Sequence, residues 1–437
     1  MSLPQRVPAG RSAVQGAAVS GLRYAAALVL LLAPNAARAQ PVAASAHVDQ
    51  NALAEGLAPR LASFLSAMRR DALGAGVSVA ILDRALAGIA IDASIPPLLT
   101  AQPEHVMAPW DYMGRLVSDT RIEGGRRMLA EHRETLDAIE TRFGVDRHAV
   151  VAIWGVESSY GTLPGTRAVV RSLATLAVAD ARRAPFWRKE LLAALTILDR
   201  GDITPERMTG SWAGAMGHTQ FMPSSYLTHA VDHDADGRRD IWQSVPDALA
   251  STASYLHRSG WKAGEPWGLE VALPAGFDYR LADPGASRTS DEWQALGVVP
   301  PPGAEWPAGM PASSMLLPAG MHGPAFLIAG NFKAILRYNN ATAYALAVGH
   351  LSDRLAGRPP LLALWPTHDP PLARAERREL QELLSRMGLD VGPIDGVLGE
   401  TTRNAVRQWQ RRQGVAEDGW PGSGLLGVLR ARAASVR

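Results

Sequence analysis

The sequence contains no cysteine in its 437 residues. This absence excludes disulfide bonds, thiolate metal sites and a cysteine nucleophile. It also excludes a lipid attached to an N-terminal cysteine, so we expect no stable membrane anchor. A strong excess of charge is absent too, because 44 basic residues stand against 42 acidic ones. The chain is instead 47% hydrophobic, which is typical of a globular protein and argues against general disorder.

Residues 1–39 have the pattern of a secretory signal peptide. Three arginines precede an apolar core at residues 25–33, and residues 37–39 offer a small-x-small cleavage site. The alternative is a membrane-spanning anchor, but this core is too short to cross a bilayer comfortably. We therefore expect an exported, soluble protein.

Removal of this leader changes the charge of the chain. It takes away four arginines and no acidic residue, which leaves 40 basic against 42 acidic residues. The isoelectric point of about 9.0 therefore belongs mostly to the leader. The sequence gives no support for a nucleic-acid partner, and we expect none.

Glu157 ends a strongly apolar run at residues 149–156. Asp146 precedes that run as a good N-cap, so the run predicts a helix that is buried on nearly every face. Residues 158–161 then break the helix, which places Glu157 in its last turn. Burial and the negative end of the helix dipole should both raise the pKa of this carboxyl group, as a general acid requires. The alternative is a helix-end glutamate whose side chain reaches water.

Residues 211–226 mix small residues with Trp212, Phe221 and Tyr226, and add neutral hydrogen-bonding side chains such as Gln220. Sugars present apolar ring faces and neutral hydroxyl groups, so this mixture is typical of a carbohydrate groove. A tightly packed loop with no ligand is the alternative.

An acidic loop follows at residues 232–240. Its carboxylates occupy positions 1, 3, 5 and 9 of an EF-hand calcium loop, with a glycine at position 6, but position 12 is Gln243. Four acids this close repel one another without a cation, which favours a structural Ca²⁺ over an ion-free turn. The candidate ligands are Asp232, Asp234, Asp236, the carbonyl of Arg238, Asp240 and Asp247.

The chain divides into a large helical unit and a small one. The large unit carries a brief strand-like alternation near residues 269–273 and a Pro- and Gly-rich excursion at residues 300–324. A Pro-rich connector, semi-rigid by composition, precedes a second helical unit. We predict a signal peptide at 1–39, a catalytic domain at 40–357, a linker at 358–372 and a small domain at 373–437.

Several of these motifs, in this order, resemble the B-type lytic murein transglycosylases over about residues 51–355. The shared stretches are residues 155–158, 172–177, 180–183, 210–217, 220–225, 232–240, 338–340 and 344–345. Residues 373–429 resemble the three-helix peptidoglycan-binding domain, although the turn at residues 418–425 lacks the usual threonine. The resemblance implies a mainly α protein. Its parts would be a lysozyme-like catalytic domain with a small irregular or β excursion and a three-helix C-terminal domain.

The family is known for cleaving the MurNAc–GlcNAc β-1,4 bond of peptidoglycan without water, leaving a 1,6-anhydro-MurNAc end. The resemblance makes Glu157 the single acid/base of such a periplasmic lyase, which acts on glycan strands. It also implies a monomer and no cofactor for the chemistry, with Ca²⁺ in a structural role only. One departure is His218, where many members carry another residue, and we attach no role to it. The groove residues implied are Gln102, Glu104, Ser211, Gln220, Tyr255, Tyr338, Asn339 and Tyr344.

Two other functions remain open on the sequence. An ordinary glycosidase needs two carboxylates across the bond, and none but Glu157 stands out near that position. A hydrolytic muramidase would nevertheless differ only in that water, rather than the substrate's C6 hydroxyl, attacks C1. The third alternative is a wall-binding protein without catalysis, which the Glu157 motifs disfavour.

Overall fold

The computed structural model describes residues 50–435, apart from residues 101–106 and 284. The predicted signal peptide at residues 1–39 lies outside the described residues. Helices dominate the described chain, as predicted. None of these helices is both long and apolar enough to cross a membrane.

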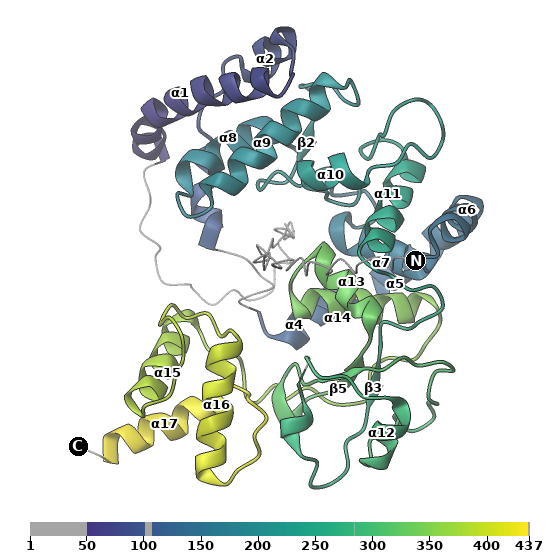
Figure 1. Cartoon of the computed structure of the whole chain (residues 1–437), viewed down its shortest axis with the longest axis vertical. Coiled ribbons are helices and arrows are strands. Elements are labelled where there is room, and N and C mark those ends of the chain that lie inside the picture. The colour runs from purple at the N-terminus through teal and green to yellow at the C-terminus, as the bar shows by residue number, and fades with distance from the viewer. Residues whose placement is uncertain (1–49, 101–106, 284, 436–437) are drawn as a thin grey trace, which may run out of the picture.

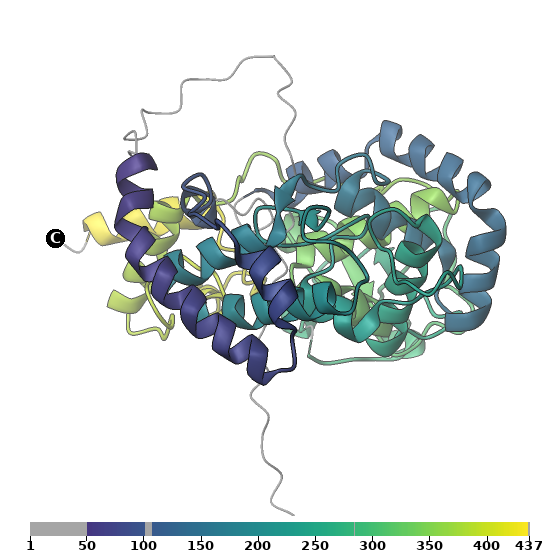
Figure 2. The same cartoon turned by 90° about the horizontal axis from the view of Figure 1, so that it is seen from above.

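The first helices of the large unit include α1 and α2, which lie with α8 and α9 on one side of the molecule (Figure 1). Seen from above, α1 crosses the outer face of this group (Figure 2). The elements up to the acidic loop are α1 (Gln50–Gly74), α2 (Val79–Leu86), η1 (Pro96–Thr100), α4 (Pro109–Leu116), α5 (Asp119–Glu131), α6 (Arg133–Phe143), α7 (Arg147–Ser158), β1 (Arg167–Ala168), α8 (Val169–Ala179), α9 (Ala184–Asp199), β2 (Thr209–Gly210) and α10 (Pro223–His229).

Helix α7 lies in the centre of the main core because apolar residues cover almost its whole circumference. It packs against α5, against α11 (Val245–Arg258) and against α14 (Thr342–Leu355). Helix α13 (Gly330–Tyr338) precedes α14 and packs on it. The helices that carry Tyr255, Tyr338 and Tyr344 therefore pack on α7 or on one another.

A small β unit separates α11 from α13. Strand β5 (Ala325–Ile328) lies between β3 (Gly268–Val271) and β4 (Ser314–Leu316), and both pairs are antiparallel. Helix α12 (Ser290–Ala295) begins with a capping box at Thr289 and buries Trp293 in a separate apolar cluster. Two 3₁₀ turns, η2 (Tyr279–Leu281) and η3 (Gly320–His322), complete the unit. The predicted β excursion is therefore confirmed.

The C-terminal unit has three helices and its own core. They are α15 (Arg374–Arg386), α16 (Glu400–Gln413) and α17 (Ser423–Ser435), and they lie beside the β unit (Figure 1). Their core contains Leu380, Leu384 and Trp409. The backbone N–H of Met321 donates a hydrogen bond of 2.9 Å to the Asp418 carboxylate, which joins the β unit to this one.

The connector between the two units is held at several points. The backbone N–H groups of Leu362 and Ala363 both donate to the Glu270 carboxylate on β3, at 3.0 and 2.8 Å. The ring of Trp365 packs on that of Trp110 in α4, with 6.1 Å between the ring centroids. The connector thus follows one path along the large unit.

Candidate active site

Glu157 lies in the last turn of α7 and is 7% exposed. The Asp146 carboxylate caps the start of this helix by accepting a hydrogen bond of 2.7 Å from the His148 N–H. The helix ends at Ser158, and the capping residue Ser159 has left-handed backbone angles and donates its N–H to the Gly155 carbonyl. The predicted cap, burial and helix end are therefore all present in the structure.

A buried tyrosine hydroxyl lies against the Glu157 carboxyl group. The Tyr344 O–H of α14 donates a hydrogen bond of 2.7 Å to Glu157 Oε1. Burial, and then the nearby Glu157 charge, hold the pKa of Tyr344 well above its usual value. Burial therefore favours the neutral form of Tyr344. The Tyr344 hydroxyl can therefore donate a hydrogen bond to a Glu157 carboxylate.

Three aromatic rings pack against one another next to this carboxyl group. The rings of Tyr255 and Tyr338 are 4.7 Å apart, and that of Phe221 is 5.8 Å from each. The Tyr338 O–H donates to the Thr219 carbonyl and the Tyr255 O–H to the Arg337 carbonyl, each at 2.5 Å. Burial, with Glu157 as the next cause, also raises the pKa of Tyr338. Hydrogen bonds to backbone carbonyls therefore hold the Tyr338 and Tyr255 rings in place.

The side-chain amide of Asn339 has a hydrogen-bond donor without an acceptor in the described part of the protein. This residue follows α13 and is 1% exposed, and its Nδ2 is buried without a hydrogen-bond partner there. A buried amide N–H₂ without a partner costs about 1–3 kcal/mol. A ligand oxygen that accepts from it would recover that free energy, which makes Asn339 a strong candidate for substrate contact.

Ser211 and Gln220 hold the loop that precedes α10. Ser211 Oγ accepts from the N–H groups of Ala213 and Ala215, at 3.3 and 3.1 Å. Gln220 has a left-handed backbone, and its Nε2 donates to the carbonyls of Pro164 and Gly217 at 2.8 and 2.9 Å. The structure therefore gives both predicted groove residues a role in shaping the loop.

The predicted groove residues Gln102 and Glu104 lie outside the described residues.

Arg121 of α5 contributes to the end of α7, and sequence reasoning missed it. Its Nε donates to the Gly155 carbonyl at 3.0 Å, and a second nitrogen donates to Ser159 Oγ at 3.3 Å. It thereby satisfies backbone at the end of α7. Nothing in the local sequence of α5 distinguishes this arginine from a surface one.

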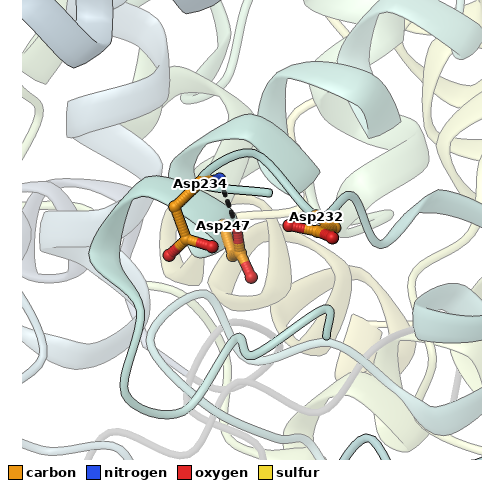
Figure 3. Close-up of side chains that lie close together, drawn as sticks. All are labelled: Asp232, Asp234 and Asp247. Atoms are coloured by element: carbon orange, nitrogen blue, oxygen red, sulfur yellow. Dashed lines mark hydrogen bonds between the residues drawn. The ribbon is translucent and has the colours of Figure 1, made fainter. Parts of the chain in front are cut away.

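The acidic loop brings three carboxylates together. Oxygens of Asp232, Asp234 and Asp247 lie within 4.8 Å of one another (Figure 3). Asp247 is fully buried at the start of α11 and accepts the N–H groups of His233 and Asp240, at 2.6 and 2.8 Å. Burial raises its pKa above the usual value. Asp232 Oδ1 is buried and has no partner in the described part of the chain.

The other predicted ligands face protein groups. Asp236 pairs with the Arg238 guanidinium at 2.9 Å and also accepts the Arg238 N–H. Asp240 accepts the backbone N–H groups of Trp242 and Gln243, at 3.0 and 2.9 Å. The structure thus brings together three of the predicted side-chain ligands, Asp232, Asp234 and Asp247, and leaves Asp236 and Asp240 outside that cluster.

Two further acids, Asp180 and Glu190, accept hydrogen bonds from protein groups. Asp180 accepts from the Trp187 indole at 3.0 Å. Glu190 of α9 accepts both the N–H and the Oγ–H of Ser224, at 2.9 and 2.7 Å. These contacts join the end of α8 and the start of α10 to α9. Such roles fit structure better than proton transfer.

Comparison with known families decides the identity of the fold. A model of the transglycosylase SLT domain matches residues 60–353, more than half of the chain. The chain belongs to this family. A model of the peptidoglycan binding domain matches residues 373–429 of the same SLT-domain protein.

Individual relatives agree with that assignment. The crystal structure of SltB3 from Pseudomonas aeruginosa in complex with NAG-anhNAM-pentapeptide is 47% identical. It covers 85% of this chain and 99% of its own, with a TM-score of 0.81. Membrane-bound lytic murein transglycosylase B of Escherichia coli K12 is 30% identical over 274 residues, 61% of this chain and 73% of that protein.

A third relative is the Escherichia coli lytic transglycosylase Slt35 in complex with calcium. It is 28% identical, covers 68% of this chain and 93% of its own, and has a TM-score of 0.57. Together these likenesses confirm the predicted fold class and family, that of the B-type lytic transglycosylases. This SLT-domain protein is therefore an enzyme, a lytic transglycosylase.

Proposed function

We propose that this enzyme cleaves the MurNAc–GlcNAc β-1,4 bond of peptidoglycan glycan strands and leaves 1,6-anhydro-MurNAc ends, with Glu157 as its only acid/base. The observation that carries the proposal is the single buried carboxyl group at the end of α7, hydrogen-bonded to Tyr344. The relative SltB3, solved with a NAG-anhNAM-pentapeptide, supports this product.

The first step requires a protonated Glu157. It gives its proton to the glycosidic oxygen while the bond from that oxygen to C1 of MurNAc breaks. The positive charge that develops at C1 is stabilised by the substrate's own N-acetyl group. The Tyr344 O–H, at 2.7 Å, stabilises the carboxylate that Glu157 becomes.

The second step uses the same group as a base. The Glu157 carboxylate takes the proton of the C6 hydroxyl, and O6 forms the new bond to C1. This restores protonated Glu157 and closes the 1,6-anhydro ring, so one carboxyl group suffices where water-using glycosidases need two.

The remaining groove residues would hold the sugar rings in place. Asn339 Nδ2 is buried without a partner among the described residues and would donate to a substrate oxygen. Tyr255 and Tyr338, whose rings pack together, would offer an apolar surface to a sugar face. Ser211 and Gln220 would shape the adjoining loop, and Gln102 and Glu104 stay predictions from the family.

The products distinguish this proposal from hydrolysis by water. We expect digestion of peptidoglycan by the purified enzyme to release muropeptides that end in anhydro-MurNAc, each lighter by one water than its reducing counterpart. Mass spectrometry of the soluble digest measures this difference. Products with reducing MurNAc ends alone would establish a muramidase instead.

We further propose that Asp232, Asp234 and Asp247 hold a structural Ca²⁺. The partnerless, buried Asp232 Oδ1 and the all-oxygen donor set fit a hard cation. Bound there, the ion would offset repulsion between the carboxylates and tie the loop to α11. It would take no part in either proton transfer. The calcium complex of the relative Slt35 supports this choice of ion.

Calcium should therefore stabilise the fold of the wild type. An ion that binds only the folded state adds about 2.7 kcal/mol at a concentration of 100 times its Kd. Thermal unfolding of metal-stripped protein, with calcium and with chelator, measures this stabilisation. Asp232→Asn should abolish the difference, whereas Asp236→Asn should keep it, because Asp236 pairs with Arg238. Equal melting temperatures of the wild type in both buffers would rule the site out.

A further inference from the structure

His218 lies between the end of α7 and the loop that follows the acidic cluster. Its backbone N–H donates to the Ile241 carbonyl at 2.9 Å. Its carbonyl accepts from Ser158 Oγ at 2.5 Å, and Ser158 Oγ in turn accepts the Gly161 N–H at 2.9 Å. Ser158 is the residue after Glu157, so the main chain of His218 is joined directly to the turn that carries the carboxyl group.

The side chain of His218 makes a second contact to the same turn. The Trp154 Nε1–H donates to His218 Nδ1 at 3.1 Å. An indole nitrogen only donates, so Nδ1 must be the unprotonated acceptor of the imidazole. This hydrogen bond therefore fixes the Trp154 ring, which lies one turn before Glu157 in α7.

Both rings are in close contact with neighbouring groups. A methyl group at Gly161 would lie 2.3 Å from the His218 ring, so the chain there is in close contact with the imidazole. The Trp154 ring packs edge-on against His132 and Tyr160, each with centroids 5.6 Å apart. Burial lowers the pKa of His218, more than the nearby Asp240 carboxylate and a backbone hydrogen bond at Trp242 raise it. The neutral, accepting imidazole is thus the form this site favours.

We propose that His218 is a positioning residue for Glu157: its Nδ1 holds the Trp154 indole, and through it the last turn of α7, in the geometry that proton transfer needs. This inference rests on the proposed role of Glu157. Catalytic groups must be held within about 0.5 Å of the productive geometry, and an error of about 1 Å can reduce the rate 10²-fold. His218 acts through Trp154 and Ser158.

The test compares variants that keep or remove the acceptor. His218→Asn places a carbonyl oxygen near the position of Nδ1, whereas His218→Leu is of similar size and cannot accept. We expect kcat of His218→Leu to fall about 10- to 100-fold with KM within about threefold of wild type, and His218→Asn to recover most of the loss. Trp154→Phe should behave like His218→Leu.

A double variant and a spectroscopic signal separate positioning from space filling. If the two side chains act as one unit, His218→Leu/Trp154→Phe should be no slower than either single variant. The Trp154 indole N–H signal in a ¹⁵N NMR spectrum, assigned by its loss in Trp154→Phe, should stay downfield in His218→Asn and move upfield in His218→Leu. If His218→Leu does not fold, the comparison of His218→Asn with Trp154→Phe decides.

Three results would overturn the inference. They are a His218→Asn variant as slow as His218→Leu, losses that add in the double variant, or a change confined to KM, which would mean direct substrate contact. A Glu157→Gln arm in the same assay keeps the two proposals apart. If Glu157→Gln is inactive and the His218 variants behave as wild type, only the positioning role fails. If Glu157→Gln is active, the proposed function fails first.

Discussion

Replacing Glu157 with glutamine should reduce turnover of peptidoglycan at least about 10²-fold, because general acid–base assistance is worth about 10²–10⁴-fold for each transfer. Glutamine keeps the shape of the side chain and can still accept from the Tyr344 hydroxyl. It can neither give a proton to the leaving oxygen nor take one from the C6 hydroxyl. Both steps of the proposed reaction therefore lose their catalyst. The fold should be unaffected, because the side chain keeps its shape.

The matched control is Glu190→Gln. Glu190 is also a buried glutamate near the loop that precedes α10, but its carboxylate binds Ser224. Its variant should keep turnover within a few-fold of the wild type. Glu157→Gln should still co-sediment with insoluble sacculi, because the region that matches the peptidoglycan binding domain, residues 373–429, does not include Glu157. Turnover above a tenth of the wild-type rate would show that the acid/base is another residue.

Replacing Gly165 with alanine should cause a large loss of stability. Gly165 has φ of +86°, and a Cβ there would lie 2.3 Å from the backbone of Gly210. Left-handed angles cost a non-glycine residue about 1–2 kcal/mol. The collision adds about 1–3 kcal/mol, because backbone cannot move aside as a flexible side chain can. Strand β2 and the neighbouring Ser211 would have to shift.

Gly76 provides the matched control for this change. Its φ of +89° is nearly the same, but nothing lies within 4 Å of the position of a Cβ. Gly76→Ala should therefore show the backbone cost alone. Chemical denaturation of both variants gives the two losses in the free energy of unfolding. Equal losses would mean that the approach of Gly165 to Gly210 is not tight in solution.

The residues of α7 could be predicted because their signals are local. An N-cap at Asp146, an apolar run and a break after Ser158 lie within one short stretch, so the sequence alone places Glu157 at the end of a buried helix. The spacing of the carboxylates in the acidic loop likewise indicates a cation site from the sequence alone. Both patterns depend on residues that are close in the chain.

Contacts between distant segments could not be predicted in this way. Tyr344 reaches Glu157 across 187 residues, and Arg121 reaches Gly155 from another helix. Asp236 and Asp240 fit the spacing of the calcium pattern as well as Asp232 and Asp234 do. Asp236 binds Arg238 and Asp240 binds the backbone N–H of Trp242, and both contacts depend on how the loop folds. Family resemblance named Tyr344, but only packing supplies its hydrogen bond.

The held connector gives the second unit an orientation as well as an attachment. Glu270 binds the N–H groups of Leu362 and Ala363, and Trp365 packs on Trp110. Folding therefore meets the entropic cost of ordering this segment before any polymer is bound. Avidity from a second contact disappears when the geometry forbids both contacts at once. A connector fixed in this way makes avidity depend on the shape of the wall polymer, whereas a loose tether would respond mainly to its local concentration.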